Sequence, residues 1–118
     1  MKIMEIYKSI ILEQKYIVYH GSRNEFKKFD FNQSYQKIAW FTNSVDHIRS
    51  GDVGAKSSKY IMQFQITINN PAGWEEYKKY GLGEIKELGF DGIILNSSDY
   101  INYIVFKPSQ IKYIKTLE

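Results

Sequence analysis

The sequence predicts a small α+β domain, and three patterns along the chain support this fold class. An amphipathic helix is expected over 2–14, because apolar residues recur there at helical spacing: Ile3, Ile6, Tyr7, Ile10 and Ile11. Residues 60–68 alternate apolar and polar side chains with period two, which is typical of a strand with one buried face. Further short strand-like runs outnumber the helical segments, and their order does not follow a regular β–α alternation.

The other expected elements are short and bounded by turn residues. The strands are apolar or β-branched runs at 16–19, 38–41, 90–95, 103–106 and 110–114. The helices are expected at 45–50, 74–80 and 82–88. Ser44 is a candidate N-cap for the first of these helices, and Gly89 is a candidate C-cap for the last. The polar segment between the first two strands is expected to be a loop anchored by Phe26, Phe29 and Phe31.

Composition places the chain among ordinary globular domains. Its 118 residues are 43% hydrophobic and 25% charged, and no linker divides them, so one domain over 1–118 is expected. The absence of cysteine excludes disulfides, zinc–thiolate sites and a cysteine nucleophile, and two histidines show no metal-ligand spacing. No signal peptide or membrane span is expected, and we therefore expect a cytoplasmic location.

Separated segments of the chain form a pattern that the individual elements do not. The first strand leads into His20-Gly21-Ser22, where glycine allows a ligand close to the main chain and histidine offers a directional hydrogen bond. Residues 38–43 read Ile-Ala-Trp-Phe-Thr-Asn before a short helix. The C-terminal third contains Gly-Phe-Asp-Gly-Ile-Ile at 89–94, and then Asn-Tyr-Ile-Val-Phe-Lys-Pro-Ser-Gln-Ile-Lys at 102–112. Before this third, Asn70-Pro71 ends a strand.

In this order, the segments resemble small phage and bacterial members of the ADP-ribosyltransferase superfamily, in the His-Tyr-Glu branch with diphtheria toxin and the poly-ADP-ribose polymerases. The resemblance covers residues 16–115. It implies two small packed β-sheets, antiparallel or mixed, that form an NAD cleft and are flanked by short helices. The chain would then be a single domain of this fold, with its core at 16–115 after the N-terminal helix.

The resemblance also implies which residues bind NAD: His20, Gly21, Ser22, Trp40, Phe41 and Tyr60. His20 would hydrogen-bond a ribose, and the backbone of Gly21 would hold the nicotinamide carboxamide. Trp40 would form a wall of the nicotinamide pocket, with Tyr60 or Tyr35 on the other side of the ring. From the residues alone, Trp40 and Tyr60 fit the interior of a strand as well as a ligand site.

Two positions depart from the family pattern. Trp40 stands where the family has tyrosine, and it keeps a flat face without the phenol oxygen. Asn102 stands where active members commonly have glutamate, and it can accept a hydrogen bond but supplies no negative charge to a developing ribosyl cation. His20 and Asn102 are therefore the expected catalytic residues. Asp99, three residues before Asn102, is a candidate for the missing charge.

The function implied by the resemblance is NAD-dependent mono-ADP-ribosyl transfer to a macromolecular target with release of nicotinamide. NAD would be a substrate, no metal would be needed, and the protein would be a phage or bacterial effector. A protein target is favoured over nucleic acid, because the basic residues form no concentrated patch in the sequence. An inactive binding module that contacts a partner stays open, because Trp40 and Asn102 fit a lost active site. An RNA 2′-phosphotransferase is disfavoured, since the chain has only two arginines, Arg23 and Arg49.

Overall fold

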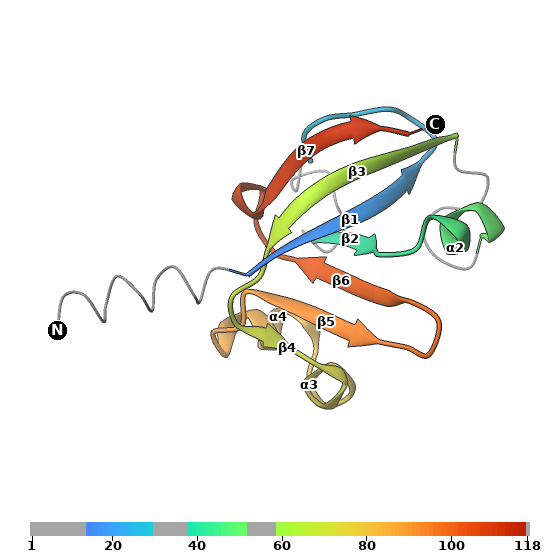
Figure 1. The fold of residues 1–118 in the computed structure, drawn as a ribbon. Helices are drawn as coiled ribbons and strands as arrows, with labels where there is room; N and C mark the ends of the chain where they lie inside the picture. The colour runs from blue at the N-terminus through green and yellow to red at the C-terminus, as the bar shows by residue number, and fades with distance from the viewer. Residues whose placement is uncertain (1–13, 30–37, 52–58, 118) are drawn as a thin grey trace, which may run out of the picture.

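The computed structural model describes residues 14–29, 38–51 and 59–117. Within these ranges the strands form one mixed seven-stranded sheet, ordered β4-β5-β6-β2-β1-β3-β7, which Figure 1 shows from bottom to top. The strands are β1 (Lys15–Ser22), β2 (Ala39–Thr42), β3 (Tyr60–Thr67), β4 (Pro71–Ala72), β5 (Gly92–Asn96), β6 (Ile101–Val105) and β7 (Ile111–Thr116). The helices are α2 (Val45–Ser50), α3 (Trp74–Lys79) and α4 (Leu82–Glu87), with a 3-10 turn at Pro108–Gln110.

The α+β class is confirmed, but the expectation of two packed sheets is wrong, because a single sheet includes all seven described strands. Two halves of this sheet meet where β1 pairs with β2, and the register there consists of one residue pair, Tyr19 with Thr42. That pair continues the ladder from β7, β3 and β1 into β2, β6, β5 and β4. By contrast, β1 pairs with β3 along its whole length, from Lys15 to Ser22. The two halves are therefore joined much more sparsely than either is joined within itself.

The predicted elements form close to their expected positions, with two differences that matter. The strand expected at 16–19 extends to Ser22, because His20 and Gly21 stay in register with β3. The segment after β3, expected only to end that strand, contains the short strand β4, which pairs in parallel with β5. Apart from Gln14, the helix expected over 2–14 lies outside the described residues, as do Phe31 and Tyr35.

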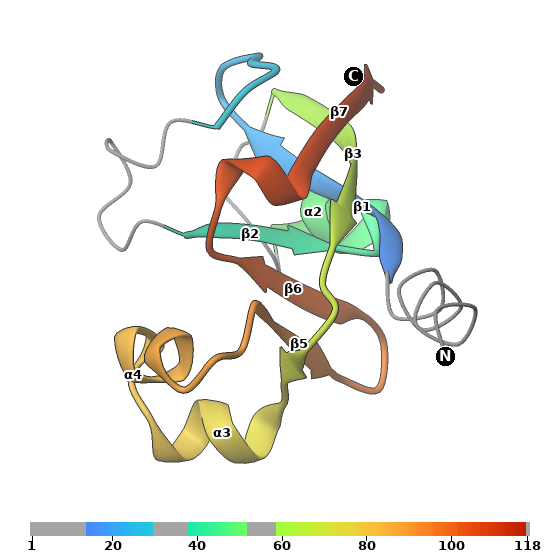
Figure 2. The ribbon, with the colours of Figure 1, turned by 90° about the vertical axis from the view of Figure 1, so that its left-hand side faces the viewer.

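The alternation seen in β3 places one of its faces in the core. Met62, Phe64 and Ile66 are fully buried there and pack with residues of β1, β2 and β6. A second buried cluster lies under α4 and contains Ile38, Ala72, Ile85, Ile93, Leu95, Ile104 and Phe106. Figure 2 shows α3 and α4 together beside β5, at the far end of the sheet from β7.

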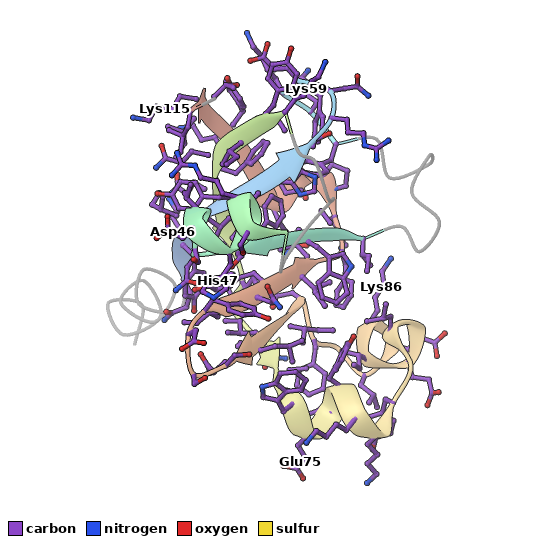
Figure 3. All side chains as sticks on the ribbon, turned by 90° about the vertical axis from the view of Figure 1, so that its right-hand side faces the viewer. Asp46, His47, Lys59, Glu75, Lys86 and Lys115 are labelled. Atoms are coloured by element: carbon purple, nitrogen blue, oxygen red, sulfur yellow. The ribbon has the colours of Figure 1, made fainter. Side chains whose placement is uncertain are left out.

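Helix α2 lies next to the junction of β1 and β2, and its ends are set by its caps. The Ser44 hydroxyl accepts a hydrogen bond from the His47 amide at 3.2 Å, as expected of an N-cap. Gly51 ends the helix with φ of 83°, a conformation that glycine adopts without strain. Ile48 is the buried residue of this helix, and Figure 3 shows α2 in front of β2. The caps therefore set the length of this short helix, and Ile48 is the residue that it buries beside β1 and β2.

Candidate functional site

A cavity of about 290 Å³ opens where β1, β2, α2 and β6 meet, and we call it the β1–β2 cavity. Its described lining residues carry no ionisable acid or Lys/Arg side chain and are Tyr19, His20, Gly21, Trp40, Phe41, Thr42, Ile48 and Asn102. Five of these residues are ones that the sequence singles out: His20, Gly21, Trp40, Phe41 and Asn102. The structure therefore brings the end of β1, the middle of β2 and the start of β6 around one hollow.

The cavity lies beside the place where β2 stops following β1. The Ile68 amide donates a backbone hydrogen bond to the Gln14 carbonyl. In this register the main-chain N–H and C=O groups of the even-numbered residues of β1 point toward β3, and those of the odd-numbered residues point toward β2. Tyr19 meets Thr42 on that second side, but within the described strands no residue of β2 is in register with Gly21. The main-chain amide and carbonyl of Gly21 thus point toward the cavity side of the strand, as groups that a ligand can bind.

His20 replaces the missing ladder contact with a side-chain hydrogen bond. Its Nδ1 lies 2.7 Å from the carbonyl oxygen of Trp40. Because a carbonyl only accepts, Nδ1 carries the hydrogen, and in the neutral ring Nε2 is left as an acceptor. The rings of Phe26, Phe29 and Phe41 surround the imidazole edge to face, with centroids 5.6, 5.1 and 5.8 Å away.

The packing of His20 also sets its protonation state. Burial among these rings lowers the pKa of His20 below its usual value of 6.5, and the hydrogen bond to Trp40 opposes this only in part. The imidazole is therefore neutral at pH 7 and offers a ligand an acceptor. A hydroxyl group donates to such an acceptor, whereas another acceptor would be repelled.

Asn102 leaves a buried acceptor without a partner. Its Oδ1 atom is inaccessible to solvent and forms no hydrogen bond within the described residues. Asn102 lies opposite Thr42 in the β2–β6 ladder, so its side chain is on the same face of the sheet as those of Thr42 and Trp40, while Phe41 points to the other face. An unpaired buried acceptor costs free energy, and a ligand that donates to it recovers that free energy. Because Oδ1 is closed to solvent, a ligand would reach this atom only after the Asn102 side chain turned toward the cavity.

Aromatic rings form both the wall and the mouth of the cavity. Phe41 is 3% exposed and belongs to the core, whereas Trp40 is 37% exposed and presents its indole at the surface. The ring of Trp40 contacts Tyr77 at 6.5 Å, and Tyr77 contacts Trp74 at 5.8 Å. Trp74 is fixed by a 2.7 Å hydrogen bond from its indole nitrogen to the carbonyl of Asn96. A row of rings thus runs from the cavity mouth onto α3.

Three described residues that were proposed from the sequence, Ser22, Tyr60 and Asp99, are not part of this lining. Ser22 ends β1, and its hydroxyl accepts from the Asn24 amide, while Tyr60 pairs with it at the start of β3. Asp99 is exposed in the turn between β5 and β6 and does not line the cavity, so the suggestion that it supplies the missing charge is not supported. Tyr35 lies outside the described residues.

Sequence reasoning missed three lining residues: Tyr19, Thr42 and Ile48. Thr42 follows the Trp-Phe pair and is a buried polar residue whose hydroxyl accepts from the Ser44 amide. Ile48 could have been found from its position in α2, since it is the one large apolar residue in the middle of that helix, whose other apolar residue, Val45, begins it. Tyr19 gives no such signal, because a tyrosine in a short strand is ordinarily a packing residue.

The described residues offer neither a metal-binding cluster nor a membrane-spanning helix. They contain no group of three or more His, Cys, Asp or Glu side chains placed to hold a metal ion. Their helices are all too short and too polar to cross a bilayer. Comparison with known proteins gives no match, whether to a protein family, to a curated protein or to a solved structure. The cavity and its chemistry are therefore the basis for any functional assignment.

Proposed function

We propose that this protein binds NAD in the β1–β2 cavity and transfers its ADP-ribose to a macromolecular target, with release of nicotinamide. The observation that supports this proposal is the meeting of His20, Gly21, Trp40 and Asn102 around one uncharged hollow. These residues come from three strands, and the resemblance assigns each of them to NAD. The ADP-ribosyltransferase fold is part of the same proposal.

The size and polarity of the cavity suit one half of the dinucleotide. A volume of about 290 Å³ is at the lower end of the range for small-molecule sites, so the nicotinamide riboside half would enter and the rest would lie outside. Nicotinamide is flat and would lie against Trp40, with its carboxamide on the main chain of Gly21. The ribose hydroxyls are donors, and their acceptors would be Nε2 of His20, the carbonyl of Gly21 and, once its side chain turned toward the cavity, Oδ1 of Asn102.

The charges of NAD also fit the surroundings of the cavity. The end of β1 leads to Arg23, and the Lys59 amide donates to the Ser22 carbonyl at 3.0 Å. Both of these basic residues are exposed and lie next to the end of β1 that carries Gly21. They would face the two negative charges of the pyrophosphate, while the uncharged interior receives the nicotinamide end.

In the proposed reaction, the bond between the nicotinamide nitrogen and C1′ of the ribose breaks, and its electron pair leaves with the nicotinamide. The positive charge moves from the ring to the ribose, and an oxygen or nitrogen nucleophile of the target then attacks C1′ and loses its proton to water. Asn102 can orient a ribose hydroxyl, but its amide dipole stabilises the ribosyl cation less than a carboxylate would. We therefore expect slow turnover and single-unit transfer.

The test is NAD binding and nicotinamide release, compared between two histidine variants. His20→Ala removes the acceptor in the cavity, and we expect it to abolish both the rise in melting temperature with NAD and the release of nicotinamide. His47→Ala is the matched control, because it removes the chain's other histidine, whose ring contacts Tyr100 outside the cavity lining. Equal NAD responses in the two variants, or no response in the unmodified protein, would refute the proposal.

A second candidate function is a binding module that holds NAD or a related nucleotide without turnover. The observation that favours it is the lack of any carboxylate among the described lining residues, so that nothing there offsets a developing positive charge. Ligand at a hundred times its Kd stabilises a protein by about 2.7 kcal/mol, which a thermal melt detects. Stabilisation by NAD without nicotinamide release, in the presence of a cell lysate, would support this second function over the first.

A further inference from the structure

A second and larger cavity lies at the other end of β1, and the proposed function does not use it. Its volume is about 560 Å³, which is within the range of small-molecule sites. We call it the Gln110 cavity, and its lining residues are Thr67, Asn69, Lys86, Gly89, Phe90, Asp91, Phe106, Lys107, Ser109 and Gln110. Thr67 pairs with Lys15 at the start of β1, whereas the first cavity adjoins Tyr19 and Gly21. The two cavities share no lining residue.

The side-chain acceptors on its wall are already occupied by the protein. The carboxylate of Asp91 accepts hydrogen bonds from the amides of Asn69 and Asn70, each at 2.8 Å. The Gln110 side-chain oxygen accepts from the amides of Phe106 and Lys107 at 3.2 and 3.0 Å. Each oxygen of Asp91 thus accepts one main-chain hydrogen bond, which fixes the carboxylate in place and leaves its negative charge at the cavity wall.

Two carbonyl acceptors on the same wall are occupied as well. The side-chain nitrogen of Gln110, Nε2, donates to the main-chain carbonyls of Thr67 and Asp91 at 2.9 and 2.7 Å. A third carbonyl, that of Gly89, accepts from the Asn70 side chain at 3.2 Å. Gln110 therefore acts as a clamp that joins the ends of β3, β5 and β6 and leaves the wall rigid. A rigid wall with fixed dipoles is what a specific site requires.

In contrast to those acceptors, three side-chain donors of the lining have no partner within the described residues. The ammonium groups of Lys86, near the end of α4, and of Lys107, after β6, form no ion pair, hydrogen bond or ring contact within the described residues. The Ser109 hydroxyl is likewise exposed and unbonded there. Two ammonium groups and a hydroxyl thus face a cavity whose nearest carboxylate is engaged. Beside them, the ring of Phe90 is half-buried and offers an apolar surface.

We propose that the Gln110 cavity binds a small organic anion, with its phosphate or carboxylate group between Lys86 and Lys107 and its apolar part against Phe90. The two ammonium groups outnumber the single carboxylate, that of Asp91, among the described lining residues, so this wall carries a net positive charge that attracts an anion. The volume exceeds that of a bare phosphate, and the Phe90 ring favours a ligand with an apolar or flat group. This site is independent of NAD and of the first cavity.

The experiment is a titration of the full chain with phenyl phosphate, followed by backbone amide NMR. We expect shifts that saturate at the amides of Phe90, Lys107 and Ser109. Benzoate in a parallel titration distinguishes a carboxylate from a phosphate, since the group that suits the two lysines better gives the lower Kd. Phenol carries the ring without the charge, and it should bind much more weakly than either anion.

Variants of the two lysines give the decisive comparison. Lys86→Gln and Lys107→Gln should each raise the Kd about fivefold, as expected for loss of one charge pair near the surface. Lys115→Gln is the matched control, because it removes the same charge from β7 at the far end of the protein, as Figure 3 shows for Lys86 and Lys115. All three lysines are exposed, so the fold should be unaffected.

Three results would overturn the proposal. The first is an unchanged Kd in the variant that carries both Lys86→Gln and Lys107→Gln. The second is phenol binding as tightly as phenyl phosphate, which would make the cavity apolar in character. The third is loss of phenyl phosphate binding in His20→Ala but not in the lysine variants, which would place the ligand in the β1–β2 cavity.

Discussion

The two ends of β1 treat buried hydrogen-bonding groups in opposite ways. At the Thr67 end, Gln110 forms four side-chain hydrogen bonds to the main chain and Asp91 forms two, so each acceptor has a partner. At the Gly21 end, the Oδ1 atom of Asn102 is buried without one, and β2 leaves β1 after a single pair.

The difference separates residues that hold the fold from residues that await a ligand. A satisfied network contributes to stability, and its loss is felt by the whole domain. An unsatisfied acceptor lowers stability and persists only if something else, such as binding, depends on it. The contrast predicts that substitutions at the two ends change stability in opposite directions.

The largest effect is expected at the satisfied end. Gln110→Ala removes four hydrogen bonds and leaves their main-chain partners, at the ends of β3, β5 and β6, without one. The free energy of unfolding should therefore fall by about 3 kcal/mol. Urea denaturation measures this change. Gln65→Ala is the matched control, because Gln65 is a half-buried glutamine of β3 whose side chain forms no hydrogen bond within the described residues. Its loss should be under about 0.5 kcal/mol, and similar losses in both variants would contradict the clamp.

A pH-dependent effect of intermediate size is expected from His20. Burial lowers the pKa of His20 in the folded protein, so below 6.5 the unfolded chain binds more protons than the folded one. The stabilisation is fully present above 6.5 and is lost as the pH falls through the folded pKa, with a slope of at most about 1.4 kcal/mol per pH unit. The difference in unfolding free energy between the unmodified protein and His20→Gln should therefore shrink on acidification. A difference that stays constant on both sides of 6.5 would show that the ring is solvated.

The smallest effect has the sign that best tests the comparison. Asn102→Leu removes an unpaired acceptor and should raise the free energy of unfolding by about 1 kcal/mol, while it weakens NAD binding. Thr42→Val is the paired variant on the facing strand, and it should lower that free energy by about 1 kcal/mol because the Thr42 hydroxyl accepts from Ser44. If both variants are destabilised equally, the buried oxygen of Asn102 has a partner in solution.

The elements and the core residues were predictable because each depends on local patterns. The alternation in β3 gave its buried face, and Ser44 and Gly51 marked the ends of α2 by their capping chemistry. The site residues of β1, β2 and β6 came from a resemblance between separated segments, which carries information on distant contacts that periodicity lacks. That resemblance placed His20, Gly21, Trp40, Phe41 and Asn102 in a common site, and one cavity includes all five.

What could not be predicted depends on contacts between segments distant in the chain. The single pair between Tyr19 and Thr42 decides whether there is one sheet or two, and no local pattern specifies it. The Gln110 clamp was also invisible, because a glutamine in a polar turn is ordinarily solvated, and its partners Thr67 and Asp91 are distant in sequence. Tyr60 was assigned to the site as a second wall of the nicotinamide pocket implied by the resemblance, but it pairs with Ser22 at the start of β3 and is not among the described residues of the cavity.

The sparse joint between β1 and β2 has a mechanical consequence. Only one ladder pair links the two halves of the sheet there, so the core residues of β1, β2, β3 and β6 that pack across it hold the halves together. A molecule that contacts both His20 and Asn102 would add a second connection between the two halves of the sheet. Binding in the cavity would then make the sheet more rigid as far as β7 and β4, its two outermost strands.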